Sequence, residues 1–123
     1  MEKVEFLILR NLLFNEDYAR KVIPFIKSEY FEDPNQKIVF EEIFKFIQEY
    51  NELATKEVLL IEVEKRNDVN ENSFKELVQL IQCLEDVPVE SGWLSDTTEK
   101  WCRDRAISQA LMESIFSADG NDE

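Results

Sequence analysis

The chain has 123 residues, of which 44% are hydrophobic, and it contains nine phenylalanines and no histidine. This length and apolar content suit one folded domain with its own core and argue against disorder. The formal net charge of −13 disfavours direct contact with nucleic acid, which attracts basic surfaces. Two cysteines without histidine cannot supply the usual four ligands of a zinc site.

Two glycines and three prolines are few helix breakers for this length, and they favour helices over a turn-rich β fold. We therefore predict an all-α fold with a compact bundle of about five helices, the head, over residues 1–88. Residues 89–92 are the predicted linker, and residues 93–119 are predicted to form one long C-terminal helix. No stretch has the roughly 20 apolar residues of a membrane span, and no signal peptide is recognised, so we expect a reduced cytoplasmic protein.

The first predicted helix covers residues 2–14 and is apolar nearly all round, which is typical of a helix in the middle of a bundle. Asn15 can cap a second helix, and Pro24 should kink or end it. The third helix has the clearest start signal in the chain. Asp33 is a good N-cap and is followed by Pro34 at the first helical position.

Gln36 stands where a capping box places its reciprocal acceptor, and the third helix should continue to about Tyr50. Thr55 can cap a shorter fourth helix, and residues 66–70 are predicted to form a turn. The strongest amphipathic pattern follows this turn. It consists of Phe74, Leu77, Val78, Ile81 and Leu84.

The long last helix has an apolar stripe too thin for a core helix and too apolar for a free surface helix. About 26 residues span roughly 39 Å at about 1.5 Å per residue, which exceeds what the head can cover. We predict that this helix packs on a second chain, on a missing antiparallel helix after the turn at residues 119–122, or on both. The alternative is that it folds back over the head. The predicted interface residues are Trp101, Ala106, Ile107, Ala110, Leu111 and Ile115.

Candidate chemistry is weak throughout the chain. The acidic pairs can in principle bind Mg²⁺ or share acid–base work, but they are scattered, and we predict that they are solvated. These pairs are Glu41–Glu42, Glu62–Glu64 and Asp96–Glu99. The run from Arg103 to Arg105 is interpreted as the rim of a helix contact rather than a phosphate grip. The same basic neighbours could lower the pKa of the Cys102 thiol, but nothing else indicates thiol chemistry.

Several segments carry a resemblance to a known family. Residues 8–14 look like its opening helix, and residues 28–32 are similar to the phage version of its aspartate-phenylalanine-tyrosine segment. Residues 99–106 resemble an arginine-acid-arginine-alanine stretch on the first arm of a helical hairpin. The following helix is matched by Ile38, Phe40, Ile43 and Phe44. The chain thus resembles the N-terminal domain of DnaB-type hexameric replicative helicases, and most closely the T4-type bacteriophage branch. Gln36 occupies roughly the place of a histidine common in cellular members.

The resemblance implies a head followed by a helical hairpin that pairs between subunits and forms a collar above the ATPase ring. The second hairpin arm would begin just after Asp122, so that residue 123 would be a truncation point. The implied partners are a second copy of the chain, primase and the helicase loader, with no direct nucleic-acid binding and no membrane. The phosphate-binding pattern G-x-x-x-x-G-K-[ST] is absent from this sequence. We therefore expect no catalysis and no cofactor in this fragment, and ATP and Mg²⁺ bound elsewhere in the full-length 5′–3′ helicase.

A second hypothesis remains open from the sequence. A small, freestanding acidic phage protein could act as an inhibitor, or as a DNA mimic that captures a basic partner. A metal-dependent enzyme is the weakest reading, because it requires acidic residues clustered around one ion.

Overall fold

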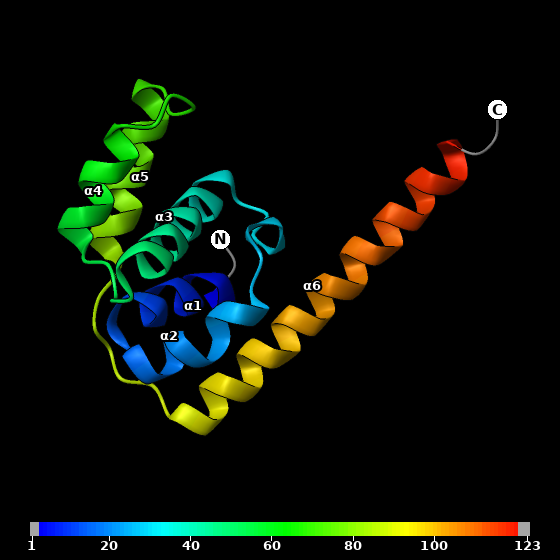
Figure 1. The fold of residues 1–123 in the computed structure, drawn as a ribbon, viewed down its shortest axis with the longest axis horizontal. Helices are drawn as coiled ribbons and strands as arrows, with labels where there is room; N and C mark the ends of the chain where they lie inside the picture. The colour runs from blue at the N-terminus through cyan, green and yellow to red at the C-terminus, as the bar shows by residue number, and fades with distance from the viewer. Residues whose placement is uncertain (1–2, 121–123) are drawn as a thin grey trace.

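The computed structural model describes residues 3–120 and the side chains of residues 3–115. All regular structure in this part is helical, which confirms the all-α prediction. The order is α1 (Lys3–Phe14), α2 (Glu16–Val22), the 3₁₀ turns η1 (Ile23–Phe25) and η2 (Ser28–Tyr30), α3 (Pro34–Tyr50), α4 (Lys56–Glu64), α5 (Glu71–Cys83) and α6 (Ser91–Gly120). The helices α1 to α5 pack together, whereas α6 passes one side of this bundle and projects well beyond it (Figure 1).

Helix α1 contributes several of the most deeply buried side chains of the head. It packs against α2, α3 and α6, and Ile8, Leu9 and Leu12 are completely buried. Burial of one such side chain stabilises the fold by roughly 1.5–3 kcal/mol. The core continues into the other helices through Val39, Phe40, Ile43, Leu59, Val63, Leu77 and Ile81. A helix that is apolar nearly all round therefore occupies the position expected from its sequence.

Three predicted helix starts are confirmed by hydrogen bonds to the capping side chain. The Asn15 side chain accepts from the backbone N–H of Tyr18 at 3.1 Å, and the Thr55 hydroxyl accepts from that of Val58 at 3.2 Å. Asp33 accepts from the next two free backbone N–H groups of α3, at 2.8 and 3.2 Å. These bonds satisfy donors that have no partner inside the helix. Pro24 lies in η1, directly after the end of α2.

The capping box predicted for Gln36 does not form. Its side chain is 1% exposed, and neither Nε2 nor Oε1 has a hydrogen-bond partner within the described part of the chain. The side chain lies instead beside a surface hollow that Phe6 and Leu80 also line. Asp33 thus caps α3 from one side only. The prediction failed because the spacing of a capping box does not reveal that this position faces the packed side of the helix.

The acidic pair Glu41–Glu42 is also not the solvated pair that the sequence predicted. Glu42 is only 6% exposed and accepts a hydrogen bond from Arg66 Nη1 at 2.7 Å. Arg66 Nη2 donates to Glu41 at 3.0 Å and to Asp68 at 2.7 Å. These hydrogen bonds, led by the one to Asp68, raise the pKa of the Arg66 guanidinium above its usual value. The predicted turn after α4 is thereby pinned to α3.

Helix α6 begins at Ser91, two residues before its predicted start. The earlier start follows from Glu90, whose side chain accepts hydrogen bonds from the backbone N–H of Gly92 at 2.8 Å and of Trp93 at 3.0 Å. The same two bonds lower the pKa of the Glu90 carboxyl. At its other end α6 extends to Gly120. Asp119 and Gly120, which the sequence predicted to lie in a turn, are therefore helical, and the remaining turn residues, 121–122, lie outside the described residues.

Candidate interface on the C-terminal helix

The first half of α6, residues 91–105, is docked on the head. Leu94 and Thr98 are 1% exposed, and Trp101 is 9% exposed. The Trp101 ring meets Tyr30 edge-on, with centroids 5.9 Å apart, and lies 5.0 Å from the ring of Phe31. Such aromatic pairs add to the free energy gained by burial. Trp101, which the sequence predicted as an interface residue, therefore belongs to the core of its own chain.

Polar contacts fix the same half of the helix. The hydroxyls of Tyr18 and Thr98 are 2.6 Å apart and form a buried hydrogen bond between α2 and α6. Burial raises the pKa of the Tyr18 phenol above its ordinary value, so this group stays protonated at neutral pH. Arg105 donates to the buried Glu5 at 2.7 Å and pairs with Glu32 at 3.0 Å. Its guanidinium also lies 5.9 Å from the centre of the Trp101 ring.

The docked half ends shortly after Arg105. Gln109 Nε2 donates to the carbonyl oxygen of Glu29 at 3.3 Å, across the end of η2. Apart from Gln109, every described side chain from residue 106 to residue 115 is exposed. The large apolar members are 52% to 60% exposed, and they are Ile107, Leu111, Met112 and Ile115. In Figure 1 this part of α6 extends away from the bundle.

Three of these side chains form one line along the helix, which we call the distal stripe. Ile107, Leu111 and Ile115 are spaced four residues apart, so they follow one ridge of the helix surface. At about 100° per residue, Leu111 lies about 120° around the axis from Arg105, which faces the head. The distal stripe therefore does not continue the head-facing side of α6. A surface other than the head is needed to cover it.

The two predicted alanines flank this stripe. Ala106 and Ala110 are both exposed and form a second row with the same four-residue spacing. Because alanine side chains are short, a helix packed on this side can approach the α6 backbone closely. Five of the six predicted interface residues thus lie together on the free part of α6, and Trp101 lies on the docked part.

Comparison with known proteins identifies the head. Residues 1–91 match the family model described as the DnaB-like helicase N terminal domain. The chain belongs to this family. It is also 32% identical, over 109 residues, to the protein named "DnaB-like replicative helicase" of Enterobacteria phage T4. That match covers 89% of this chain and 23% of the T4 protein, so the chain spans about a quarter of its relative's length.

The two matches end at different places. The family model stops at residue 91, where α6 begins. A match over 109 residues is longer than that range and must include part of α6. The likeness to the T4 helicase therefore extends beyond the head of this DnaB-like domain into the helix that carries the distal stripe.

The charged run beside Trp101 divides between the two halves of α6. Arg105 pairs with Glu5 of the head. On the exposed surface, Arg103 pairs with Glu99 at 3.5 Å and Lys100 pairs with Asp104 at 3.4 Å. Exposed pairs of this kind contribute little to stability, typically about 0.3–0.5 kcal/mol. The basic groups of this run are thus engaged within the chain rather than gathered into a phosphate site.

The pKa of the Cys102 thiol is not lowered, as its basic neighbours suggested, but raised. Burial raises the pKa of its thiol to about 11, because a thiolate is disfavoured away from water. At neutral pH this sulfur is a protonated, weakly nucleophilic group. The sequence suggested a lowered pKa because it shows the neighbouring basic residues but not the burial of the thiol.

Within the described residues no helix is long and apolar enough to cross a membrane. The same part of the chain holds no group of three or more histidine, cysteine, aspartate or glutamate side chains that could bind a metal ion.

Proposed function

We propose that this chain is the N-terminal oligomerisation and partner-docking domain of a phage replicative 5′–3′ DNA helicase. In this proposal α6 is the first arm of a helical hairpin that packs against neighbouring subunits in a collar. The exposed distal stripe carries the proposal, because three large aliphatic side chains stand in line on a helix that leaves its own head. Exposed apolar surface of this kind marks interaction sites.

The free energy gained by burying the stripe is similar to the cost of association, so the isolated chain should associate weakly. Two copies that bury their stripes against each other cover six aliphatic side chains, roughly 9–18 kcal/mol if all were fully exposed beforehand. Each is little more than half exposed, so about half of that gain is available. Association itself costs about 4–15 kcal/mol in lost freedom of motion. The balance is close to zero, so pairing should depend on concentration, and a second hairpin arm would strengthen it.

The remaining parts of the proposal follow from family membership. Primase and the helicase loader are the proposed partners of the head, and ATP and Mg²⁺ would act in the rest of the parent protein, in the cytoplasm of the infected cell. The net charge of −13 supports a role without direct nucleic-acid contact. Family membership also favours this function over a freestanding acidic inhibitor.

Sedimentation velocity over a wide range of protein concentration tests the self-association. We expect the weight-average sedimentation coefficient to rise with concentration for the parent chain. Leu111→Asp should keep it at the monomer value, because a carboxylate cannot be buried in an apolar contact without a partner. Ile61→Asp is the matched control, since it adds the same charge at a similarly exposed aliphatic residue of α4. A strict monomer at the highest concentration, or equal effects of the two variants, would contradict the proposal.

A further inference from the structure

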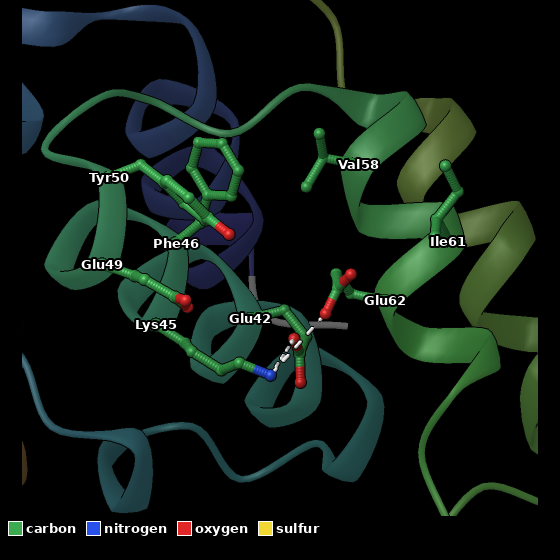
Figure 2. A pocket seen from close by; sticks show the side chains of 8 residues that line it. All are labelled: Glu42, Lys45, Phe46, Glu49, Tyr50, Val58, Ile61 and Glu62. Atoms are coloured by element: carbon green, nitrogen blue, oxygen red, sulfur yellow. Dashed lines mark ion pairs between the residues drawn. The ribbon is translucent and has the colours of Figure 1, made fainter.

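A second apolar surface lies on the head, away from the distal stripe. It is a hollow of about 180 Å³ between the second half of α3 and the outer side of α4. Figure 2 shows Phe46 and Tyr50 on one side of this hollow and Val58 and Ile61 on the other. We call it the α3–α4 hollow. It is larger than a cavity of about 150 Å³ that admits benzene, so it has room for one large apolar side chain.

The apolar side chains that line the hollow are much more exposed than side chains of the core. Tyr50 is 58% exposed and Ile61 is 54% exposed, whereas their neighbours Ile43 and Leu59 are completely buried. The rings of Phe46 and Tyr50 pack against each other at an angle of 43°, with centroids 4.8 Å apart, and together they form one wall. The hollow is therefore a formed apolar surface that the folded head does not need for its own core.

The rim of the hollow is acidic. Between residues 41 and 64 the sequence carries seven glutamates and two lysines. Lys45, the lysine at the rim, is already engaged, 3.7 Å from Glu42 and 3.6 Å from Glu62. These two ion pairs cross one end of the hollow in Figure 2. Glu49 also lines the hollow, and it forms no ion pair with any of the described residues.

The Glu62 carboxylate keeps its charge at neutral pH. The hydrogen bond from Lys65 to Glu62, 3.0 Å long, lowers the pKa of the Glu62 carboxyl. An apolar hollow with a negative rim selects its occupant by two properties. A large apolar side chain gains from the hollow, and basic groups beside it gain from the rim.

We propose that the α3–α4 hollow docks a basic segment of a partner protein, which inserts one large apolar side chain between Tyr50 and Ile61 while its lysines or arginines pair with Glu49 and Glu62. This inference rests on the proposed docking function and names the surface of the head that performs it. Nucleic acid is a poor occupant because its phosphates meet the glutamate rim. The distal stripe of a second copy is also a poor occupant, because residues 106–115 contain no lysine or arginine to pair with the rim.

Two synthetic peptides test the proposal by fluorescence anisotropy. Both are lysine-rich and fluorescein-labelled, and they differ only at one central position, which is leucine in one peptide and alanine in the other. We expect the leucine peptide to bind the parent chain about tenfold more tightly, or by about 1.4 kcal/mol, because it buries the larger apolar side chain. Equal binding of the two peptides would show attraction to the acidic surface alone and would overturn the proposal.

The variant Ile61→Asp separates apolar docking from charge by the sign of its effect. It adds a negative charge, so purely electrostatic binding of a basic peptide would become tighter. Docking in the hollow predicts the opposite, with the leucine peptide bound about tenfold more weakly and no longer preferred over the alanine peptide. Unchanged or tighter binding by Ile61→Asp would overturn the inference. Since the side chain is 54% exposed, this substitution leaves the core intact.

Leu111→Asp is the matched control in this experiment, because it adds the same charge on α6. It should leave the affinity for both peptides within about twofold, since it lies far from the hollow along the fold. In the sedimentation experiment Leu111→Asp is the test and Ile61→Asp the control, and in the peptide experiment these roles are reversed. Failure of one proposal can therefore be distinguished from failure of the other. If Ile61→Asp weakens binding of the leucine peptide and Leu111→Asp leaves sedimentation unchanged, the hollow stands and self-association through α6 falls. The reverse pattern retains the self-association and rejects the hollow.

Discussion

The two halves of α6 are one continuous helix with opposite environments. Residues 91–105 lie against α1, α2 and η2, and their large side chains at Leu94 and Trp101 are buried. Residues 106–115 carry aliphatic side chains of similar size that remain more than half exposed. Helix formation therefore does not depend on burial along the whole length. The docked half supplies a nucleus, and good helix formers such as alanine, leucine, methionine and glutamine extend it.

The two halves of α6 differ in whether the head covers their large apolar side chains. In the first half the fold accounts for Leu94 and Trp101, because packed aromatic rings, a buried hydrogen bond and a buried ion pair join α6 to the head. Trp93, near the start of the helix, stays 52% exposed. In the second half, none of the residues that the structure describes covers the distal stripe. Substitutions in the first half should consequently change stability, and substitutions in the second half should change association.

The largest contrast is expected between Trp101→Ala and Leu111→Ala. Removing a buried tryptophan side chain costs about 3–5 kcal/mol in the free energy of unfolding. The effect should lie toward the lower end, because the indole N–H has no partner within the described part of the chain and its loss removes that penalty. Leu111→Ala should stay within about 0.5 kcal/mol, as is usual for exposed positions. Urea unfolding at low protein concentration measures both.

Low protein concentration is essential to this comparison, since association would stabilise the folded state of a chain that keeps its leucine. Comparable destabilisation by the two substitutions would mean that the second half of α6 is packed in solution on its own head. A stable Trp101→Ala variant with lost association would restore the role that the sequence alone suggested for this tryptophan.

A smaller contrast is expected between two arginines that are two residues apart. Arg105→Leu removes one partner of the buried Glu5 and should lower the free energy of unfolding by about 3 kcal/mol, the lower end of the cost of breaking a buried pair. Arg103→Leu breaks only an exposed pair with Glu99 and should cost no more than about 0.5 kcal/mol. Thermal and urea unfolding of both variants check the difference. Equal losses would show that net charge, rather than the contact with Glu5, sets the stability.

Much of the fold was predictable because its signals are local. The caps at Asn15, Asp33 and Thr55 each act within three residues, and the apolar periodicity of α1 and α5 predicted helices that the structure contains. The exposed positions of the distal stripe also followed from periodicity, since a thin stripe on a long helix leaves few alternatives.

The missed features depend on residues distant in the sequence. Arg66 reaches Glu42 across 24 positions, and no local pattern indicates that pair. The docking of Trp101 depends on Tyr30 and Phe31 of η2, and helical spacing cannot tell which part of a long helix another segment will cover. The α3–α4 hollow was missed for a related reason. Ile61 lies in an apolar helical pattern, and the sequence does not distinguish it from its buried neighbours.

The last contrast concerns the rates at which the two thiols react. Cys83 is exposed, whereas Cys102 is half buried on the docked half. Burial raises the pKa of the Cys102 thiol from 9.0 to about 11, which lowers its thiolate fraction at pH 8 about 100-fold. A disulfide reagent such as dithiobisnitrobenzoate should therefore modify one thiol quickly and the other slowly.

The slow thiol then reports how firmly the first half of α6 is docked. Trp101→Ala should accelerate the modification of Cys102, because weaker packing exposes the sulfur more often. Leu111→Asp should leave that rate unchanged, since the distal half does not hold the helix on the head. If Leu111→Asp accelerated the slow thiol as much as Trp101→Ala, the two halves would be one cooperative unit. The distal stripe would then stabilise the head and would no longer be a surface reserved for a partner.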